Sequence, residues 1–148
     1  EGVAVPVIGE LVQFEFVRNP GAAFSLGIGA TWIFAIIACA VAVFIVVFAR
    51  RIRSLAWATV FGMLLGGTIG NLVDRLFREP GFGQGHVIDF IRIWGFPAIF
   101  NVADMAITFS VVILVILTIA GHGLDGRRSR GSAAEPVAPA AGATDGDA

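Results

Sequence analysis

Two aspartates lie where they can do acid chemistry and where a membrane would penalise them. Asp104 is the only charged residue in a stretch of 23 residues, 98–120. A carboxylate inside a membrane span costs roughly 2.5–3.5 kcal/mol on insertion scales, so Asp104 should face a partner or a water-filled cavity. Asp89 lies in the preceding polar segment, between Ile88 and Phe90. In a bundle of helices both carboxylates would lie near the outer membrane face, where they could meet.

Two carboxylates close together cannot both ionise cheaply, so such a pair shares a proton. Aspartyl peptidases require this state, because one carboxylate takes a proton from water while the other protonates the amide. Spacing alone leaves an alternative open, a non-enzymatic transporter or complex subunit whose aspartates serve as a relay or as helix glue. Transporter sequences typically contain internal repeats or broken helices in paired halves, and this sequence shows neither.

Other peptidase chemistries lack their motifs. The sequence contains no His-Glu-x-x-His for zinc, no Gly-x-Ser-x-Gly and no Gly-x-Gly-Asp. Cys39 lies among apolar residues, where packing is the better interpretation, and one cysteine forms no disulfide framework. His86 and His122 lie outside the apolar stretches and are interpreted as solvated polar residues. The sequence therefore predicts no metal and no cofactor.

Further polar residues accompany the aspartates. Asn71, Asp74 and Arg75 share one helix face, and Asn101 precedes Asp104 by three positions. Hydrogen bonding between helices explains either asparagine as well as a role in a site does. The neighbouring Asp74 and Arg75 favour a structural ion pair at a helix end.

The elements that must position these residues are membrane helices. Of the 148 residues 57% are hydrophobic and 14% are charged, which excludes a disordered chain and disfavours a water-soluble domain. Apolar stretches at 31–49, 55–73 and 98–120 are each long enough to cross a hydrocarbon core of about 30 Å. The net charge of −1 argues against nucleic acid as a partner.

Arginine placement predicts the orientation. Arg50, Arg51 and Arg53 lie in the turn between the first two spans, and three more arginines follow the third span, at Arg127, Arg128 and Arg130. The positive-inside rule places both groups in the cytoplasm. The N-terminal segment is then already outside, so a further span is expected before it, giving four helices in the intact protein.

Three regions follow from these patterns. Residues 1–30 carry a short strand at 11–16. Residues 31–120 form the helical bundle with an outer loop at 77–97, and this loop carries a second short strand at 87–91. Residues 121–148 are predicted to be a disordered cytoplasmic tail. The glycine-rich stretch 80–85 could gate entry or be a tolerated surface insertion. The predicted fold is a mainly α membrane protein, an antiparallel transmembrane bundle with a small outer-face β-sheet.

Four boxes, in order, resemble those of bacterial lipoprotein signal peptidase (signal peptidase II). Residues 19–25, Asn-Pro-Gly-Ala-Ala-Phe-Ser, are similar to its Asn-x-Gly-x-Ala-Phe-Ser box. Residues 70–75 resemble Gly-Asn-x-x-Asp-Arg, residues 87–90 resemble Val-x-Asp-Phe, and residues 100–104 resemble Phe-Asn-x-Ala-Asp. The family's first span has no counterpart here.

The resemblance implies a four-helix aspartyl endopeptidase that removes signal peptides from diacylglyceryl-modified prolipoproteins, cutting before the lipidated cysteine. It makes Asp89 and Asp104 the catalytic pair. It also implies residues that bind peptide backbone, orient the carboxylates or support the helix end, namely Asn19, Asn71, Asp74, Arg75 and Asn101. The expected partners are the lipidated substrate and membrane lipid, and the expected protein is a monomer. The implied location is the bacterial plasma membrane, with the site near the outer face.

Overall fold

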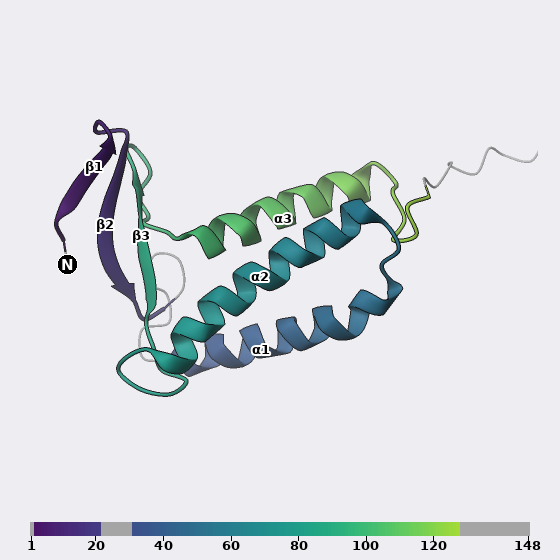
Figure 1. Cartoon of the computed structure of the whole chain (residues 1–148), viewed down its shortest axis with the longest axis horizontal. Helices are drawn as coiled ribbons and strands as arrows, with labels where there is room; N and C mark the ends of the chain where they lie inside the picture. Colours follow the sequence, from purple (N-terminus) through teal and green to yellow (C-terminus); the bar gives the residue numbers. More distant parts are fainter. Residues whose placement is uncertain (1, 22–30, 128–148) are drawn as a thin grey trace, which may run out of the picture.

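The fold is an up-and-down helical bundle with a small sheet at one end (Figure 1), seen in a computed structural model that describes residues 2–21 and 31–127. The bounds of its elements are β1 Ala4–Ile8, β2 Val12–Asn19, α1 Thr31–Phe48, the 3-10 turn η2 Ala49–Arg51, α2 Leu55–Phe77, β3 Val87–Ile93 and α3 Val102–Ile119. Helices α1 and α3 run in one direction and α2 runs in the other, so the antiparallel arrangement is confirmed (Figure 1).

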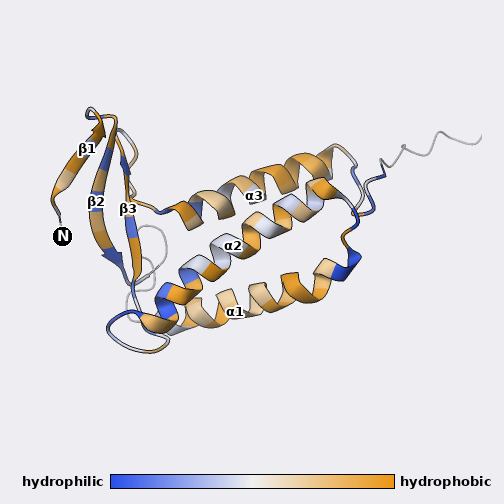
Figure 2. Cartoon of the chain, in the orientation of Figure 1, coloured by the Kyte–Doolittle hydropathy of each residue, from blue (hydrophilic) through white to orange (hydrophobic). Residues whose placement is uncertain are grey.

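Three segments are long and apolar enough to cross a membrane, namely Thr31–Arg51, Leu55–Phe77 and Val102–Ile119. Apolar residues cover α1 and α3 along most of their length (Figure 2). The three predicted spans are therefore confirmed, with two shifted boundaries. Helix α2 continues beyond Val73, and α3 begins at Val102 because Asn101 caps it there.

Helix α2 lies between α1 and α3 (Figure 1), and glycine lets it approach α3 closely. A Cβ atom at Gly67 would lie 2.5 Å from the backbone oxygen of Ala103 and 2.7 Å from Cγ1 of Ile107. No side chain fits there, so the two backbones come together at this point. This close approach brings Asn71 on α2 beside the first turn of α3.

The sheet has the strand order β1-β2-β3, with both pairs antiparallel. The predicted strands at 11–16 and 87–91 are present as β2 and β3. Strand β1 was not predicted, because residues 3–8 include no polar residue, so they show no alternation of apolar and polar side chains, and one of them is a proline. The strand is exposed along its whole length. A bulge in β2 between Phe14 and Val17 shifts the register before the Val17–Asp89 pair.

The loop between α2 and β3 folds back onto the end of α2. The backbone N–H of Gly85 donates to the carbonyl oxygen of Arg75 at 2.9 Å, which satisfies one of the open carbonyls of the helix end. A Cβ atom at Gly85 would lie 2.3 Å from the carbonyl oxygen of Asp74. The loop therefore needs glycine at this position, and β3 starts directly beside α2.

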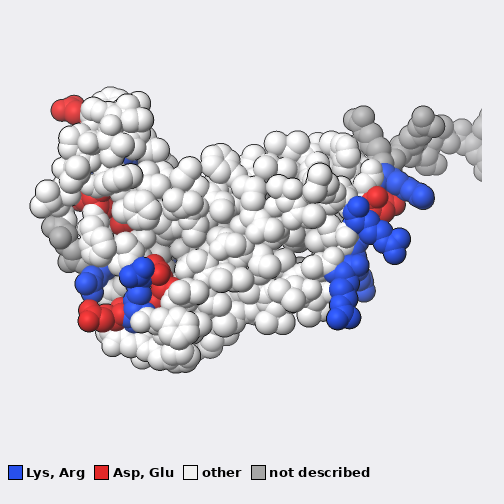
Figure 3. Space-filling view, in the orientation of Figure 1, with Lys and Arg blue, Asp and Glu red and all other residues white. Residues whose placement is uncertain are grey.

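Charged side chains gather at the two ends of the bundle, and a long uncharged surface separates them (Figure 3). At the end opposite the sheet, the carbonyl oxygen of Leu124 accepts hydrogen bonds from the N–H groups of Arg53 and Ser54, at 3.0 and 3.1 Å. The indole of Trp57 donates to the carbonyl oxygen of His122. Residues 121–127 thus form hydrogen-bonded turns, which differs from the predicted disorder, and the rest of the predicted tail lies outside the described residues.

Candidate active site

Asn101 organises the site from the first turn of α3. Its Oδ1 accepts from the N–H of Asp104 at 3.0 Å, and Oδ2 of Asp104 accepts from the N–H of Asn101 at 3.1 Å. This reciprocal capping box satisfies two open donors of the helix end. It also sets the orientation of the Asn101 amide, since Oδ1 must face the helix and Nδ2 must face away from it.

The Asn101 amide group links β3 to α2. Nδ2 lies 2.8 Å from Oδ1 of Asp89 and 3.1 Å from Oδ1 of Asn71. Because Asn71 accepts through its oxygen, its own Nδ2 is directed at Asp104 Oδ1, 2.8 Å away. Asn101 is only 5% exposed. Two asparagines thus connect the two carboxylates from three different elements.

Asp89 lies at the centre of this network and is only 3% exposed. Its second oxygen accepts from Nδ2 of Asn19 at 2.9 Å, and Oδ1 of Asn19 accepts from the N–H of Gly21. Burial, which disfavours the charged form, raises the pKa of Asp89, and the nearby Asp104 carboxylate adds to the rise. Hydrogen bonds from Asn19 and Asn101, together with the charge of Arg75, act in the opposite direction.

Arg75 is only 8% exposed and directs its guanidinium at backbone oxygens. Nη2 donates to the carbonyl oxygen of Gly21 at 3.0 Å, and Nη1 donates to that of Asn71 at 3.2 Å. Its Cζ atom lies 5.7 Å from the ring centroid of Phe34 on α1. Arg75 therefore connects α1, α2 and the chain after β2, and its hydrogen bonds hold Gly21 near Asn19.

The ion pair expected between Asp74 and Arg75 is replaced by a different one. Oδ1 of Asp74 accepts from Nε of Arg78 at 2.6 Å, and Oδ2 accepts from the N–H of Ile88 at 3.0 Å. On a helix, residues four apart face each other and adjacent residues do not, which explains the choice of Arg78. Asp74 thus ties the end of α2 to β3, one residue before Asp89.

A cleft of about 740 Å³ opens beside the two carboxylates, and we call it the aspartate cleft. Five of the seven predicted site residues line it, namely Asn19, Asn71, Arg75, Asp89 and Asp104. Asn101 and Asp74 belong to the surrounding structure. Within residues 2–21 and 31–127, no group of three or more His, Cys, Asp or Glu side chains is placed to hold a metal ion.

Most of the other residues that line the aspartate cleft are apolar, including Ile99, Phe100, Met105 and Phe109. Sequence reasoning missed them, because in a chain this apolar nothing distinguishes a wall residue from one that faces lipid. It also missed Gly21 as a backbone acceptor for Arg75. The predicted residues Ala22 to Ser25 of the first box lie outside the described residues.

The fold and the site together define an integral membrane protein. At one end of its bundle, asparagine amide groups donate hydrogen bonds to two neighbouring carboxylates. The chain belongs to the signal peptidase (SPase) II family, whose model matches residues 1–120. This membership favours the peptidase interpretation over the relay interpretation.

Curated relatives agree with the family assignment. A lipoprotein signal peptidase of Leifsonia xyli subsp. xyli is 57% identical over 142 residues, which cover 95% of this chain and 66% of that protein. One from Rhodococcus jostii is 47% identical over 127 residues, covering 86% of this chain and 64% of that protein. The chain thus spans about two thirds of the length of these relatives.

A solved structure described as a bacterial membrane enzyme at 2.3 Å resolution shares the fold. It has a TM-score of 0.71 and 29% sequence identity, over 80% of this chain and 71% of that chain. A second such structure, at 1.9 Å resolution, has a TM-score of 0.67 at the same identity. The arrangement of bundle and sheet is therefore one already seen in membrane enzymes.

Proposed function

We propose that this protein is an aspartic endopeptidase that removes signal peptides from diacylglyceryl-modified prolipoproteins, cutting before the lipidated cysteine. The family membership and the relatives named lipoprotein signal peptidase support the reaction and the substrate class. The observation that carries the aspartic mechanism is the Asn101 amide, which binds Asp89 directly and reaches Asp104 through Asn71.

The proposed mechanism uses the two carboxylates in different protonation states. The raised pKa of Asp89 suits the carboxyl group that holds the shared proton. Asp104 acts as the base and takes a proton from a water molecule, and the resulting hydroxide attacks the scissile carbonyl carbon. Asp89 then gives its proton to the leaving amide nitrogen. Asn19, Asn71 and Asn101 keep the carboxylate oxygens oriented and contribute no proton.

The cleft suits a substrate that is already in the bilayer. Its apolar side is formed by the outer half of α3, including Met105, Ile107 and Phe109. Phe109 is exposed on the surface of a candidate membrane span. A lipidated polypeptide can therefore reach the carboxylates by lateral movement in the membrane, with its apolar chains against apolar residues.

The proposed location is the bacterial plasma membrane, with the sheet and the aspartate cleft at the outer face and the C-terminus in the cytoplasm. The arginines of the α1–α2 connection support this orientation, since the connection that carries Arg50, Arg51 and Arg53 lies at the end of the bundle opposite the sheet (Figure 1). The site is assembled within one chain, which supports a monomer as the active form.

The proposal is tested by replacing each aspartate with its uncharged isostere in the intact protein. Asp89→Asn and Asp104→Asn should each abolish cleavage of a synthetic lipidated prolipoprotein peptide, because neither amide can exchange a proton with water. The measurement is peptide cleavage by purified protein, with thermal unfolding as the check on folding. Cleavage at the parent rate by either folded variant would exclude the aspartate pair as the catalytic group.

A further inference from the structure

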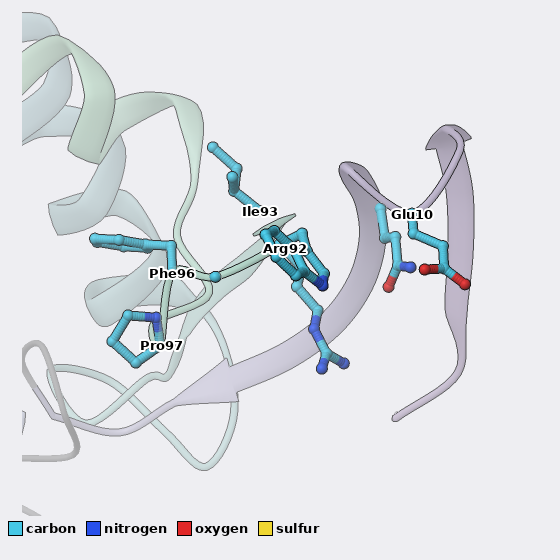
Figure 4. Close-up of a pocket in the computed structure, with 8 residues that line it drawn as sticks. Glu10, Arg92, Ile93, Phe96 and Pro97 are labelled. Carbon is cyan, nitrogen blue, oxygen red and sulfur yellow. The ribbon is translucent and has the colours of Figure 1, made fainter.

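A second pocket lies next to the aspartate cleft, on the other side of the loop that joins β3 to α3. Its volume is about 390 Å³, and we call it the side pocket. Figure 4 shows Glu10 on the β1–β2 turn at one edge, Phe96 and Pro97 at the opposite edge, and Arg92 between them. The full lining is Glu10, Gln13, Arg92, Ile93, Trp94, Gly95, Phe96 and Pro97.

The side pocket and the aspartate cleft share a wall. Ile93, Phe96 and Pro97 line both of them. The ring of Phe96 packs edge-on against Phe100 with the centroids 5.8 Å apart, and Phe100 itself lines the aspartate cleft. A chain that leaves the aspartate cleft over this wall therefore enters the side pocket directly.

The loop that forms the wall is held in one conformation. The N–H of Trp94 donates to the carbonyl oxygen of Leu11 at 2.9 Å, and the N–H of Phe96 donates to that of Ile93 at 3.0 Å. Gly95 takes a φ of +78°, which glycine adopts without strain. Trp94 lies on the surface of this loop, where it is 73% exposed.

The side pocket offers groups that suit a polypeptide. Gln13 lies opposite Arg92 in the strand register, and Arg92 donates to Oε2 of Glu15 at 2.6 Å. The lining itself carries one acid, Glu10, and one base, Arg92, and Arg92 is neutralised by its ion pair with Glu15 outside the lining, which leaves Glu10 as the surplus charge. Exposed aromatic rings together with amide and carboxylate groups can bind an extended chain, and the surplus negative charge favours a basic residue in it.

We propose that the side pocket binds the water-soluble segment of the substrate polypeptide that follows the lipidated cysteine, with a preference for basic over acidic residues. This inference rests on the proposed function. Cleavage before a lipidated cysteine leaves the acyl chains in the bilayer while the polypeptide beyond that cysteine must turn toward water. The residues that line the side pocket belong to β2, β3 and the adjoining turns, and the sheet lies at one end of the bundle (Figure 1), where that turn would take place.

The test compares two lipidated peptides that share the same signal segment and the same diacylglyceryl cysteine. The short peptide ends one residue after the cysteine, and the long peptide continues for about eight neutral polar residues, enough to span the pocket at about 3.3 Å per residue. With intact protein in lipid nanodiscs, Trp94→Ala should raise KM about three- to tenfold for the long peptide and leave kcat unchanged. Neither constant should change for the short peptide.

The preference for basic residues gives a second, independent test, which compares KM for peptides of opposite charge and uses the variant Glu10→Gln. A long peptide with two lysines in its downstream segment should have a KM about two- to fivefold lower than its counterpart with two glutamates. Glu10→Gln should bring the KM values of the lysine and glutamate peptides closer together. The matched variant Asp125→Asn, at the opposite end of the bundle, should leave the difference between them unchanged.

The outcomes separate the two proposals. If the parent protein cleaves neither peptide, the proposed function fails and this inference fails with it. If the parent protein cleaves both, but Trp94→Ala and Glu10→Gln change nothing, the inference alone is overturned. The inference is also overturned if Trp94→Ala raises KM equally for the short and the long peptide. In that case the side pocket contacts the lipid or the signal segment, which both peptides share.

Discussion

Asn101 performs two tasks with one side chain, since its oxygen caps α3 and its nitrogen binds Asp89 and Asn71. Serine also caps helices well but cannot supply the amide donor. The two tasks can therefore be separated by substitution.

We predict that Asn101→Ser retains most of the thermal stability and loses most of the activity. Asn101→Ala, which removes the cap as well, should be less stable than Asn101→Ser by about 1 kcal/mol. Thermal unfolding in detergent and cleavage of a lipidated peptide measure the two effects. Full activity in a folded Asn101→Ser variant would show that the amide bridge is not needed for catalysis.

The raised pKa of Asp89 has a defined consequence for stability. The folded protein holds this proton more tightly than the unfolded chain, so Asp89 contributes stability that is fully present below its unfolded pKa. That contribution is lost as the pH rises through the folded pKa.

We therefore predict that the Tm difference between Asp89→Asn and the parent protein shifts in favour of the variant as the pH is raised from about 4 to 7. An asparagine carries no charge to desolvate at either pH. Asp125→Asn, which replaces an exposed carboxylate, serves as the control and should show no such trend. A Tm difference that is constant across this range would contradict burial as the cause of the pKa rise.

At the scale of elements, the α2–α3 contact at Gly67 determines where Asn71 meets Asp104. A methyl group at Gly67 would overlap the backbone of Ala103, the residue before Asp104. Backbone cannot move aside as a flexible side chain can, so the two helices must separate.

We predict that Gly67→Ala lowers the free energy of unfolding by about 1–3 kcal/mol and reduces activity by pulling Asn71 from Asp104. Gly66→Ala, one position away on the same helix, has no atom within 4 Å of the new Cβ and should change neither quantity. Thermal unfolding and cleavage assays on the pair of variants test this. Equal behaviour of the two variants would rule out close helix approach as the positioning device.

At the scale of the whole molecule, two charged ends separated by a long uncharged surface match a protein that spans a bilayer (Figure 3). Among the described residues, the end opposite the sheet carries four arginines (Arg50, Arg51, Arg53 and Arg127) and a single acid, Asp125, and the positive-inside rule predicts that this end faces the cytoplasm. This orientation puts the aspartate cleft and the side pocket on the outer face.

The prediction is that a membrane-impermeant maleimide labels Gln84→Cys in intact cells, and labels Asp125→Cys only after the cells are permeabilised. Both variants carry Cys39→Ala, which removes the single cysteine of the 148-residue sequence. Gln84 lies in the loop before β3 and Asp125 in the turn after α3, and both are exposed. The reverse labelling pattern would invert the proposed topology.

The spans, their antiparallel order and strands β2 and β3 could be predicted from the sequence, because apolar length and alternation are local properties. Asp104 could also be singled out from the sequence, since a carboxylate without a charged neighbour in its span demands a partner. Strand β1 could not be predicted, because its residues lack alternation and pair only through β2. The turns at 121–127 depend likewise on contacts with Arg53, Ser54 and Trp57, which are distant in the sequence.

By itself, the sequence determined the membrane class, the spans and the residues of the two carboxylate boxes. Only the tertiary structure decided which side chains connect those boxes. Asp74 pairs with Arg78 and Ile88 instead of Arg75, Arg75 binds Gly21, and Asn101 bridges to Asp89. The reason is physical: residue type and spacing determine which groups a membrane penalises, but hydrogen bonds require particular atoms within about 3 Å. That proximity arises only when α2, α3 and β3 have packed together.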